Sequence, residues 1–192
     1  MINIKLKGGV TLSLQIFILG LLHKGDYHPY DVKKRILQGT NNAVNVTDGN
    51  LYYNFEALLK KEFIQKSQII QAENRPDKIT YSITPKGREA FKEEIYKSFK
   101  NAKSIRTLLP VLPFLEYVDA KKLFFYVEDV LERLNKRAKE FEEKGLATEI
   151  DPVNPDYKML IGEVVTESIK LEIQMFNKLL LVLKTRLSSP TL

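Results

Sequence analysis

Residues 46–66 read VTDGNLYYNFEALLKKEFIQK, and this stretch decides the fold. It predicts a helix from Thr47 to Lys61, because threonine is a favoured helix N-cap and because apolar residues recur at the i, i+4 and i+7 positions of one helix face. That face should pack inward, which leaves the opposite face, with Tyr53, open. The apolar positions are Leu51, Phe55 and Leu58.

Two helices are predicted before this one. Residues 12–23 are almost wholly apolar, so this helix should be largely buried. Residues 29–38 begin with Pro29, which suits the first turn of a helix, and carry a basic edge at 33–35.

A hairpin and a fourth helix are predicted after it. The runs FIQKSQII (63–70) and ITYSI (79–83) are rich in β-branched residues that favour strands, with a polar turn at 71–78 between them. Thr84 and Pro85 then open a helix as N-cap and first residue. The predicted order, three helices, a two-stranded hairpin and a helix, is that of a winged helix-turn-helix.

The C-terminal half has a different pattern. Residues 119–144 and 157–187 are predicted to be two long amphipathic helices. The second carries two adjoining apolar stripes, more than one partner helix requires, so we expect packing within the chain and against a second subunit. A closed monomeric bundle is the alternative. The expected fold class is mainly α with a small β-hairpin: a winged helix-turn-helix domain over residues 1–100 and a helical dimerisation domain over 101–192.

Composition supports a soluble globular protein that meets a polyanion. The 192 residues are 44% hydrophobic and 28% charged, which is ordinary for a folded domain. The net charge of +6 lies in residues 1–100, whereas basic and acidic residues balance in 101–192, and a basic half suggests nucleic acid.

Three segments together resemble the PadR family of transcriptional regulators: ILGLLHKGDYHPYDVKKRI (18–36), the stretch 46–66 quoted above, and ITYSITPKGREAF (79–91). The strongest pieces are Tyr30, then Gly49-x-Leu51-Tyr52, then Tyr81-x-Ile83-Thr84-x-x-Gly87. By length and pattern, the two long C-terminal helices resemble the longer PadR subfamily, whose C-terminal domain makes the dimer.

The resemblance implies a homodimer that binds a pseudo-palindromic operator in double-stranded DNA, usually as a repressor, and in some members a small molecule that releases the DNA. Three features depart from the family pattern. Pro29 and Glu62 stand where glycines are usual, and Glu56 with Ala57 stands where basic residues are frequent. Glu56 would repel phosphate, so the alternative is a protein-interaction or assembly module that does not bind DNA.

Candidate DNA contacts follow from residue type and place. Asparagine can bond an adenine edge with two hydrogen bonds, and tyrosine can contact a thymine methyl or a phosphate. The helix N-terminus at Thr47 favours an anion, and lysine or arginine side chains would contact phosphates. Tyr30 belongs to the family motif, and Tyr52 is given low weight because packing is its more frequent role. The base-reading candidates are Asn50, Tyr53 and Asn54, with Tyr52 beside them. The phosphate candidates are Lys33, Lys34, Lys60, Arg75 and Lys78.

The dimerisation candidates are apolar positions of the two C-terminal helices: Leu123, Val127, Leu131, Leu134, Ile161, Val164, Ser168, Leu171, Met175 and Leu179. An aromatic group at 114–126 is either the lining of a ligand cavity or, the favoured interpretation, ordinary core.

Other classes of function find no support. The chain has no nucleophile elbow, no glycine-rich phosphate loop and no zinc-protease motif, so we expect no enzyme and no cofactor. His23, Asp26 and His28 lack metal-site spacing, so no metal is expected. The absence of cysteine fits a reducing cytoplasm, and no apolar run has the length of a membrane span.

Overall fold

The computed structural model describes residues 3–5, 11–39, 45–72, 75–145 and 154–188. The chain forms two compact units, which are treated separately: unit 1 comprises Met1–Ser98 and Arg106–Val118, and unit 2 comprises Phe99–Ile105 and Asp119–Leu192. Unit 1 is therefore discontinuous in sequence, because residues 106–118 belong to it although residues 99–105 belong to unit 2. The predicted domains 1–100 and 101–192, which divide the chain at a single point, stay a prediction.

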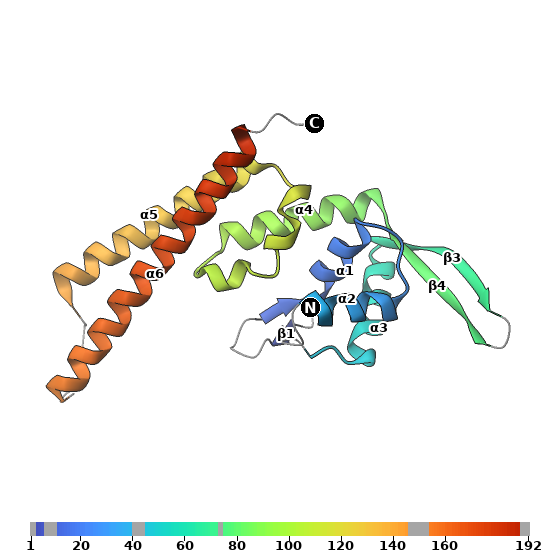
Figure 1. The fold of residues 1–192 in the computed structure, drawn as a ribbon, viewed down its shortest axis with the longest axis horizontal. Helices are drawn as coiled ribbons and strands as arrows, with labels where there is room; N and C mark the ends of the chain where they lie inside the picture. Colours follow the sequence, from blue (N-terminus) through green and yellow to red (C-terminus); the bar gives the residue numbers. More distant parts are fainter. Residues whose placement is uncertain (1–2, 6–10, 40–44, 73–74, 146–153, 189–192) are drawn as a thin grey trace. The chain divides into compact units, whose positions relative to one another are not determined.

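Unit 1 contains the predicted three helices (Figure 1). They are α1 (Leu14–Leu22), α2 (Pro29–Gly39) and α3 (Asp48–Lys60). The predicted first helix is shorter at its start, because Thr11–Ser13 form strand β2, which pairs with β1 (Asn3–Lys5). The prediction of a largely buried α1 is confirmed, since most of its residues are buried.

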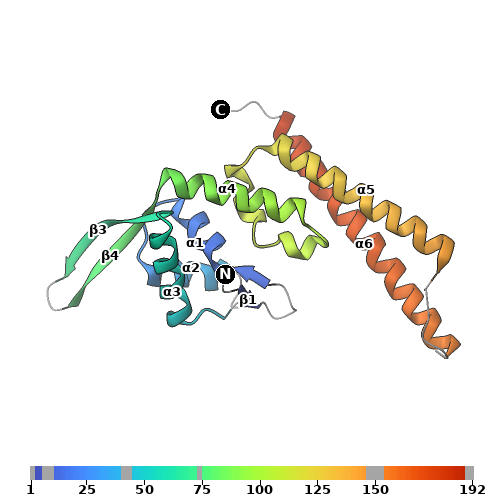
Figure 2. The same cartoon turned by 180° about the vertical axis from the view of Figure 1, so that it is seen from behind.

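The wing is an antiparallel hairpin of β3 (Ile64–Ala72) and β4 (Arg75–Ile83), and it extends away from the helices (Figure 2). Both strands run further than predicted, so most of the segment expected to be a polar turn is strand. Strands can pair without apolar side chains, because backbone hydrogen bonds hold them. Tyr27 adds a short bridge to β4, with backbone hydrogen bonds of 3.2 and 3.0 Å to Tyr81.

The junction between α3, the wing and α4 (Pro85–Lys100) explains two residues of the family motif. The Thr84 hydroxyl donates to the Glu62 carbonyl at 2.7 Å and accepts from the Gly87 amide at 3.0 Å. Glu62 has a φ of 60°, the left-handed region that usually holds glycine. The Lys86 ammonium donates to its carboxylate at 2.7 Å and lowers the pKa of Glu62. The chain therefore makes the family's turn here without the family's glycine.

His23, just beyond the end of α1, is held neutral in unit 1. Its ring lies 4.8 Å from the ring of Phe91 and 4.4 Å from that of Tyr117, and its Nδ1 accepts from the Arg88 guanidinium at 3.0 Å. Burial first, then the charges of Arg88 and Lys92, lower the pKa of His23 from 6.5 to about 4.

The free energy of unfolding should therefore depend on pH through His23. Between pH 6.5 and about 4 the unfolded chain takes up a proton that the folded chain excludes, so stability falls as the pH falls through this window. Urea unfolding at about pH 7 and about pH 5, followed by circular dichroism, measures the fall. His23→Phe keeps an aromatic ring without the titration and should lose less stability between these pH values. An equal loss in this variant would show that other groups cause it.

Unit 2 contains the two predicted long helices, α5 (Ala120–Lys144) and α6 (Pro155–Ser188), side by side and antiparallel (Figure 1). Asp119 caps α5 by accepting from the Lys121 amide at 2.8 Å, and Gly145 ends it with a φ of 62°. Between α4 and α5 the chain forms two short 3-10 turns, η1 (Ile105–Leu108) and η2 (Leu112–Tyr117). The predicted fold class, mainly α with one winged hairpin, is confirmed.

Candidate nucleic-acid interface

Helix α3 has the predicted orientation. Thr47 caps it, with its hydroxyl accepting from the Asn50 amide at 3.3 Å, and the predicted apolar stripe is buried. Tyr53 on the other side is 54% exposed. One face of α3 is thus fixed in the core of unit 1, and the other is open along its first two turns.

Asn54 does not lie where the sequence interpretation put it. Its side chain is 0% exposed, so it cannot touch a base, and the prediction that Asn54 reads DNA directly is wrong. Its position explains the burial: at i+3 from Leu51 and i−4 from Leu58, it lies on the inward stripe. Its amide Nδ2 donates to both the backbone oxygen and the side-chain Oδ1 of Asn50, at 2.8 and 2.9 Å.

The tyrosines of the predicted site are open. Tyr52 and Tyr53 are exposed on α3, and Tyr30, at the start of α2, is 64% exposed. Tyr30 lies in the first turn of α2, and Tyr52 and Tyr53 lie in the second turn of α3.

The predicted cations differ in availability. Lys34, Lys60 and Lys78 are exposed. Lys33 is not a free charge, because it donates to the Asp48 carboxylate at 2.6 Å and its side chain is only 22% exposed; this pairing argues against Lys33 as a phosphate contact.

The two predicted wing cations are Arg75 and Lys78, and the backbone pairing of the hairpin gives the position of each. Arg75 begins β4, opposite Ala72 and next to the hairpin end, and its side chain lies outside what the structure describes. Lys78 pairs with Ile70 within the strands, so it lies further from the tip than predicted.

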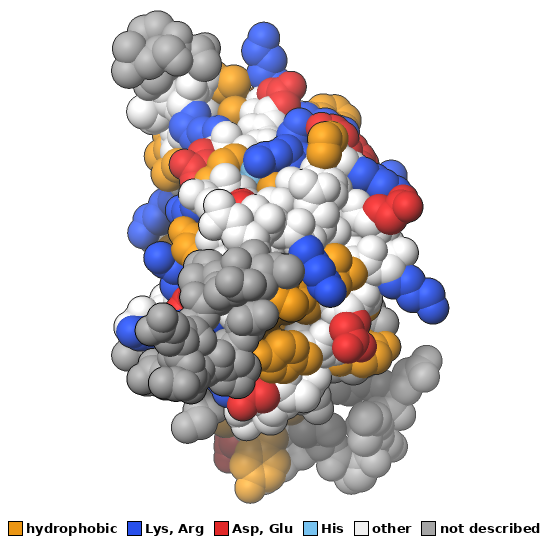
Figure 3. Space-filling model, turned by 90° about the vertical axis from the view of Figure 1, so that its right-hand side faces the viewer, with side chains coloured by type: hydrophobic (Ala, Val, Ile, Leu, Met, Phe, Trp, Pro, Cys, Tyr) orange, Lys and Arg blue, Asp and Glu red, His pale blue; other side chains and the backbone are white. Residues whose placement is uncertain are grey.

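Acidic side chains interrupt the basic surface. Glu56 is exposed on α3, and Lys and Arg side chains alternate with acidic and hydrophobic ones on the face shown in Figure 3. An interface here would gain its specificity from polar and aromatic side chains more than from a dense positive patch.

In unit 2 the dimerisation candidates fall into two groups. Five of them are buried between α5 and α6 of the same chain, so the prediction that they meet a second subunit is wrong for these: Leu123, Val127, Leu131, Leu134 and Leu179. The other five lie on an outer stripe of α6, named here the exposed seam: Ile161, Val164, Ser168, Leu171 and Met175. Val164 is 57% and Leu171 51% exposed.

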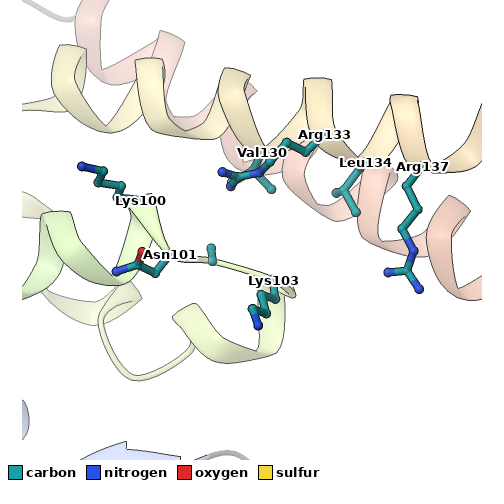
Figure 4. A pocket seen from close by; sticks show the side chains of 8 residues that line it. Lys100, Asn101, Lys103, Val130, Arg133, Leu134 and Arg137 are labelled. Atoms are coloured by element: carbon teal, nitrogen blue, oxygen red, sulfur yellow. The ribbon is translucent and has the colours of Figure 1, made fainter.

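A cavity of about 440 Å³ in unit 2 was not foreseen (Figure 4). Apolar and basic side chains both line it, and they come from α5, from the end of α4 and from the residues just after α4. The only sequence signal was a pair of arginines four residues apart beside the apolar face of α5. The lining residues are Lys100, Asn101, Ala102, Lys103, Val130, Arg133, Leu134 and Arg137.

The aromatic group at 114–126 lines other space. Phe114 packs edge-on against Phe17 and Phe91 at 6.1 and 5.6 Å, and it is buried in unit 1. The core interpretation that the sequence favoured therefore holds for Phe114, whereas Phe125 is 66% exposed and lies outside any core. None of the described helices is long and apolar enough to cross a membrane.

Comparison with known proteins agrees with the fold. Residues 18–93 match the family described as "Transcriptional regulator PadR-like family". No curated protein matches the chain.

Among solved structures, the chain is similar to a transcriptional regulator from Clostridium thermocellum, Cth-833, with 27% identity over 44% of this chain and 78% of that one, at a TM-score of 0.40. It is also similar to Bacillus subtilis PadR in complex with operator DNA, with 17% identity over 88% and 98% of the two chains, at a TM-score of 0.42. A third is smu.1604c from Streptococcus mutans UA159, with 22% identity over 91% and 98%, at a TM-score of 0.40.

The family match runs from the second half of α1 through α2, α3 and the wing to the first half of α4. The motif residues Tyr30, Leu51 and Gly87 lie inside it. Residues 18–93 of this chain are thus similar to the PadR-like family of transcriptional regulators.

Proposed function

We propose that this chain is a sequence-specific DNA-binding transcriptional repressor that acts as a homodimer on a pseudo-palindromic operator. The observation that carries the proposal is the orientation of α3. Its apolar stripe is buried, while Tyr52 and Tyr53 are exposed and Asn50 half-buried near its N-terminal end. Side chains near the N-terminus of a recognition helix are those that contact base edges in the major groove.

Phosphate contacts would come from elements around α3. Lys34 on α2 and Lys60 at the end of α3 are exposed, and Lys78 is exposed on the wing. The backbone amides at the start of α3, after the cap Thr47, would favour a phosphate oxygen. Such contacts fix the position of the protein on the duplex without choosing the sequence.

The dimer would form through the exposed seam of α6. Its residues follow the alternating three- and four-residue spacing with which helices pack against one another, and α5 already covers the other apolar stripe of α6. A homodimer places two copies of α3 for two half-sites related by a twofold axis.

An effector, where one acts, would bind in the basic cavity of unit 2. Its lining combines the apolar side chains of Ala102, Val130 and Leu134 with cations that include Lys103 and Arg137; Figure 4 shows the labelled members of this set. Apolar and basic side chains together suit an organic anion with an apolar body.

The alternative function, an assembly module that does not bind DNA, is favoured by the exposed Glu56 and by the neutralisation of Lys33. A fluorescence-anisotropy titration on the DNA upstream of its own gene, between about 50 and 200 mM salt, separates the two. A repressor should bind with an affinity that falls steeply with salt. Lys34→Ala or Lys60→Ala should each reduce, by about 0.9, the slope of the logarithm of the binding constant against the logarithm of the salt concentration.

Lys97→Ala is the matched control, since Lys97 is exposed on α4 outside the proposed interface, and it should leave the slope unchanged. Binding that is absent or independent of salt would favour the module. The same titration with benzoate tests the cavity: an effector site predicts weaker operator binding in wild type and no change in Arg137→Glu.

A further inference from the structure

The pair Asn50 and Asn54 on α3 is arranged unlike the other polar residues of that helix. Asn54 is wholly buried, and its amide nitrogen donates to the backbone oxygen and to the side-chain oxygen of Asn50, at 2.8 and 2.9 Å. Its own Oδ1 is buried with no hydrogen-bond partner among the described residues. An orphaned buried oxygen destabilises a protein, so the pair carries a cost that an apolar residue at position 54 would avoid.

Chemistry fixes the orientation of both amides. The backbone oxygen of Asn50 can only accept, so the group of Asn54 that faces it must be the NH₂. That NH₂ also faces the Asn50 side chain, and a second NH₂ there would place donor against donor. The side-chain oxygen of Asn50 must therefore point toward Asn54. The Nδ2 group of Asn50 then points away from Asn54 and can donate to another molecule. Within the described part of the chain, no hydrogen bond from this Nδ2 is found.

We propose that Asn54 is a positioning residue that holds Asn50 with its amide donor outward, so that Asn50 selects a keto base, guanine or thymine, in the major groove. The proposal rests on the proposed function and specifies it. It also replaces the adenine contact expected of Asn50 from its residue type alone.

The major groove makes this choice chemically clear. Guanine presents the O6 and N7 acceptors and thymine the O4 acceptor, whereas cytosine presents its N4 amino group and adenine its N6 amino group beside an N7 acceptor. The keto oxygens O6 and O4 stand where adenine and cytosine carry amino donors, so a donor aimed at that position favours guanine or thymine. A two-bond contact with adenine needs both the oxygen and the nitrogen of an asparagine amide. The amide of Asn54 already donates to the side-chain oxygen of Asn50. The Nδ2 donor of Asn50 is therefore the group that distinguishes one base from another.

The test converts the outward donor into an acceptor. In Asn50→Asp, one carboxylate oxygen accepts from the Asn54 amide and the other faces the groove. Selection of bound sequences from random DNA is carried out with the full-length wild type and with this variant. Wild type should favour G or T at one position of each half-site. The variant should favour C or A at that position by about tenfold or more, with the rest of the motif retained.

Asn54→Leu tests the positioning role. Leucine has the same branched shape and the same number of side-chain heavy atoms, and it has no buried oxygen to leave unpaired, so thermal stability should be retained. Without the amide at position 54 to orient it, Asn50 can turn over, and the preference for keto bases should fall severalfold at that one position. A merely structural role for Asn54 would instead change stability or affinity and leave base preference intact.

The outcomes distinguish failure of this inference from failure of the proposed function. A wild-type motif with A or C at the position that responds to Asn50→Asp, or a motif that does not respond, overturns the inference while the repressor function stands. An unchanged motif in Asn54→Leu overturns the role of Asn54. Failure of wild type to select any sequence overturns the proposed function, and this inference with it.

Discussion

Gly87→Ala is expected to lower the free energy of unfolding by about 3 kcal/mol or more. A Cβ atom at this position would lie 1.9 Å from the carbonyl oxygen of Phe63 and 2.8 Å from its carbonyl carbon. Both are backbone atoms, and the same oxygen accepts from the Thr84 amide at 3.0 Å. No rotamer change relieves such a clash, so the wing and α4 must move apart.

Urea unfolding followed by circular dichroism measures this effect, and Gly49→Ala is the matched control. Gly49 lies in the first turn of α3, and a methyl group added there would have nothing within 4 Å, so its replacement should raise stability by up to about 1 kcal/mol. If both alanines had small effects of the same sign, the close contact at Gly87 would not exist.

Leu171→Glu is expected to weaken the homodimer at least about 100-fold. Leu171 lies within the exposed seam of α6, between Ser168 and Met175, and is half exposed in the single chain. In a symmetric dimer the variant would bury two unpaired carboxylates, and each costs several kcal/mol unless it is neutralised. About 3 kcal/mol in total already gives a change of about 100-fold. Sedimentation velocity over a concentration series measures the dissociation constant.

Asn177→Glu is the control for charge, because Asn177 is exposed on α6 outside the exposed seam. It should leave the dimer intact. The dissociated Leu171→Glu variant should also bind operator more weakly, because a monomer occupies one half-site without the added affinity of a linked second subunit on the other. A dimer that tolerates glutamate at 171 would place the subunit interface elsewhere.

The helices of this chain were predictable because their signals are local. The period of Leu51, Phe55 and Leu58 sets the buried face of α3, and Thr47 and Asp119 mark where α3 and α5 begin. The wing was predicted too short. Apolar patterning marks strands that are half buried, and residues 71–78, QAENRPDK, carry no such pattern.

The burial of Asn54 was present in the sequence pattern and was misinterpreted. Asn54 completes the i, i+3, i+4, i+7 pattern with Leu51, Phe55 and Leu58, yet its polarity suggested an outward role. Similarly, the apolar patterns of α5 and α6 predict that these faces are buried, but they do not predict which helix buries them. Leu123 and Leu179 were therefore assigned to a second subunit, whereas the partner helix of the same chain covers them. Tertiary pairing decides such cases, and it is not a local property.

The central claim is that the open face of α3 enters the major groove, and site-specific photo-crosslinking tests it most directly. Tyr53 is replaced by the photoreactive residue benzoylphenylalanine, which also carries an aromatic ring, and the protein is irradiated on its operator. The account predicts a covalent adduct at a base within each half-site, and none from the same residue placed at Lys97 on α4. Adducts from position 97 with none from position 53 would contradict it.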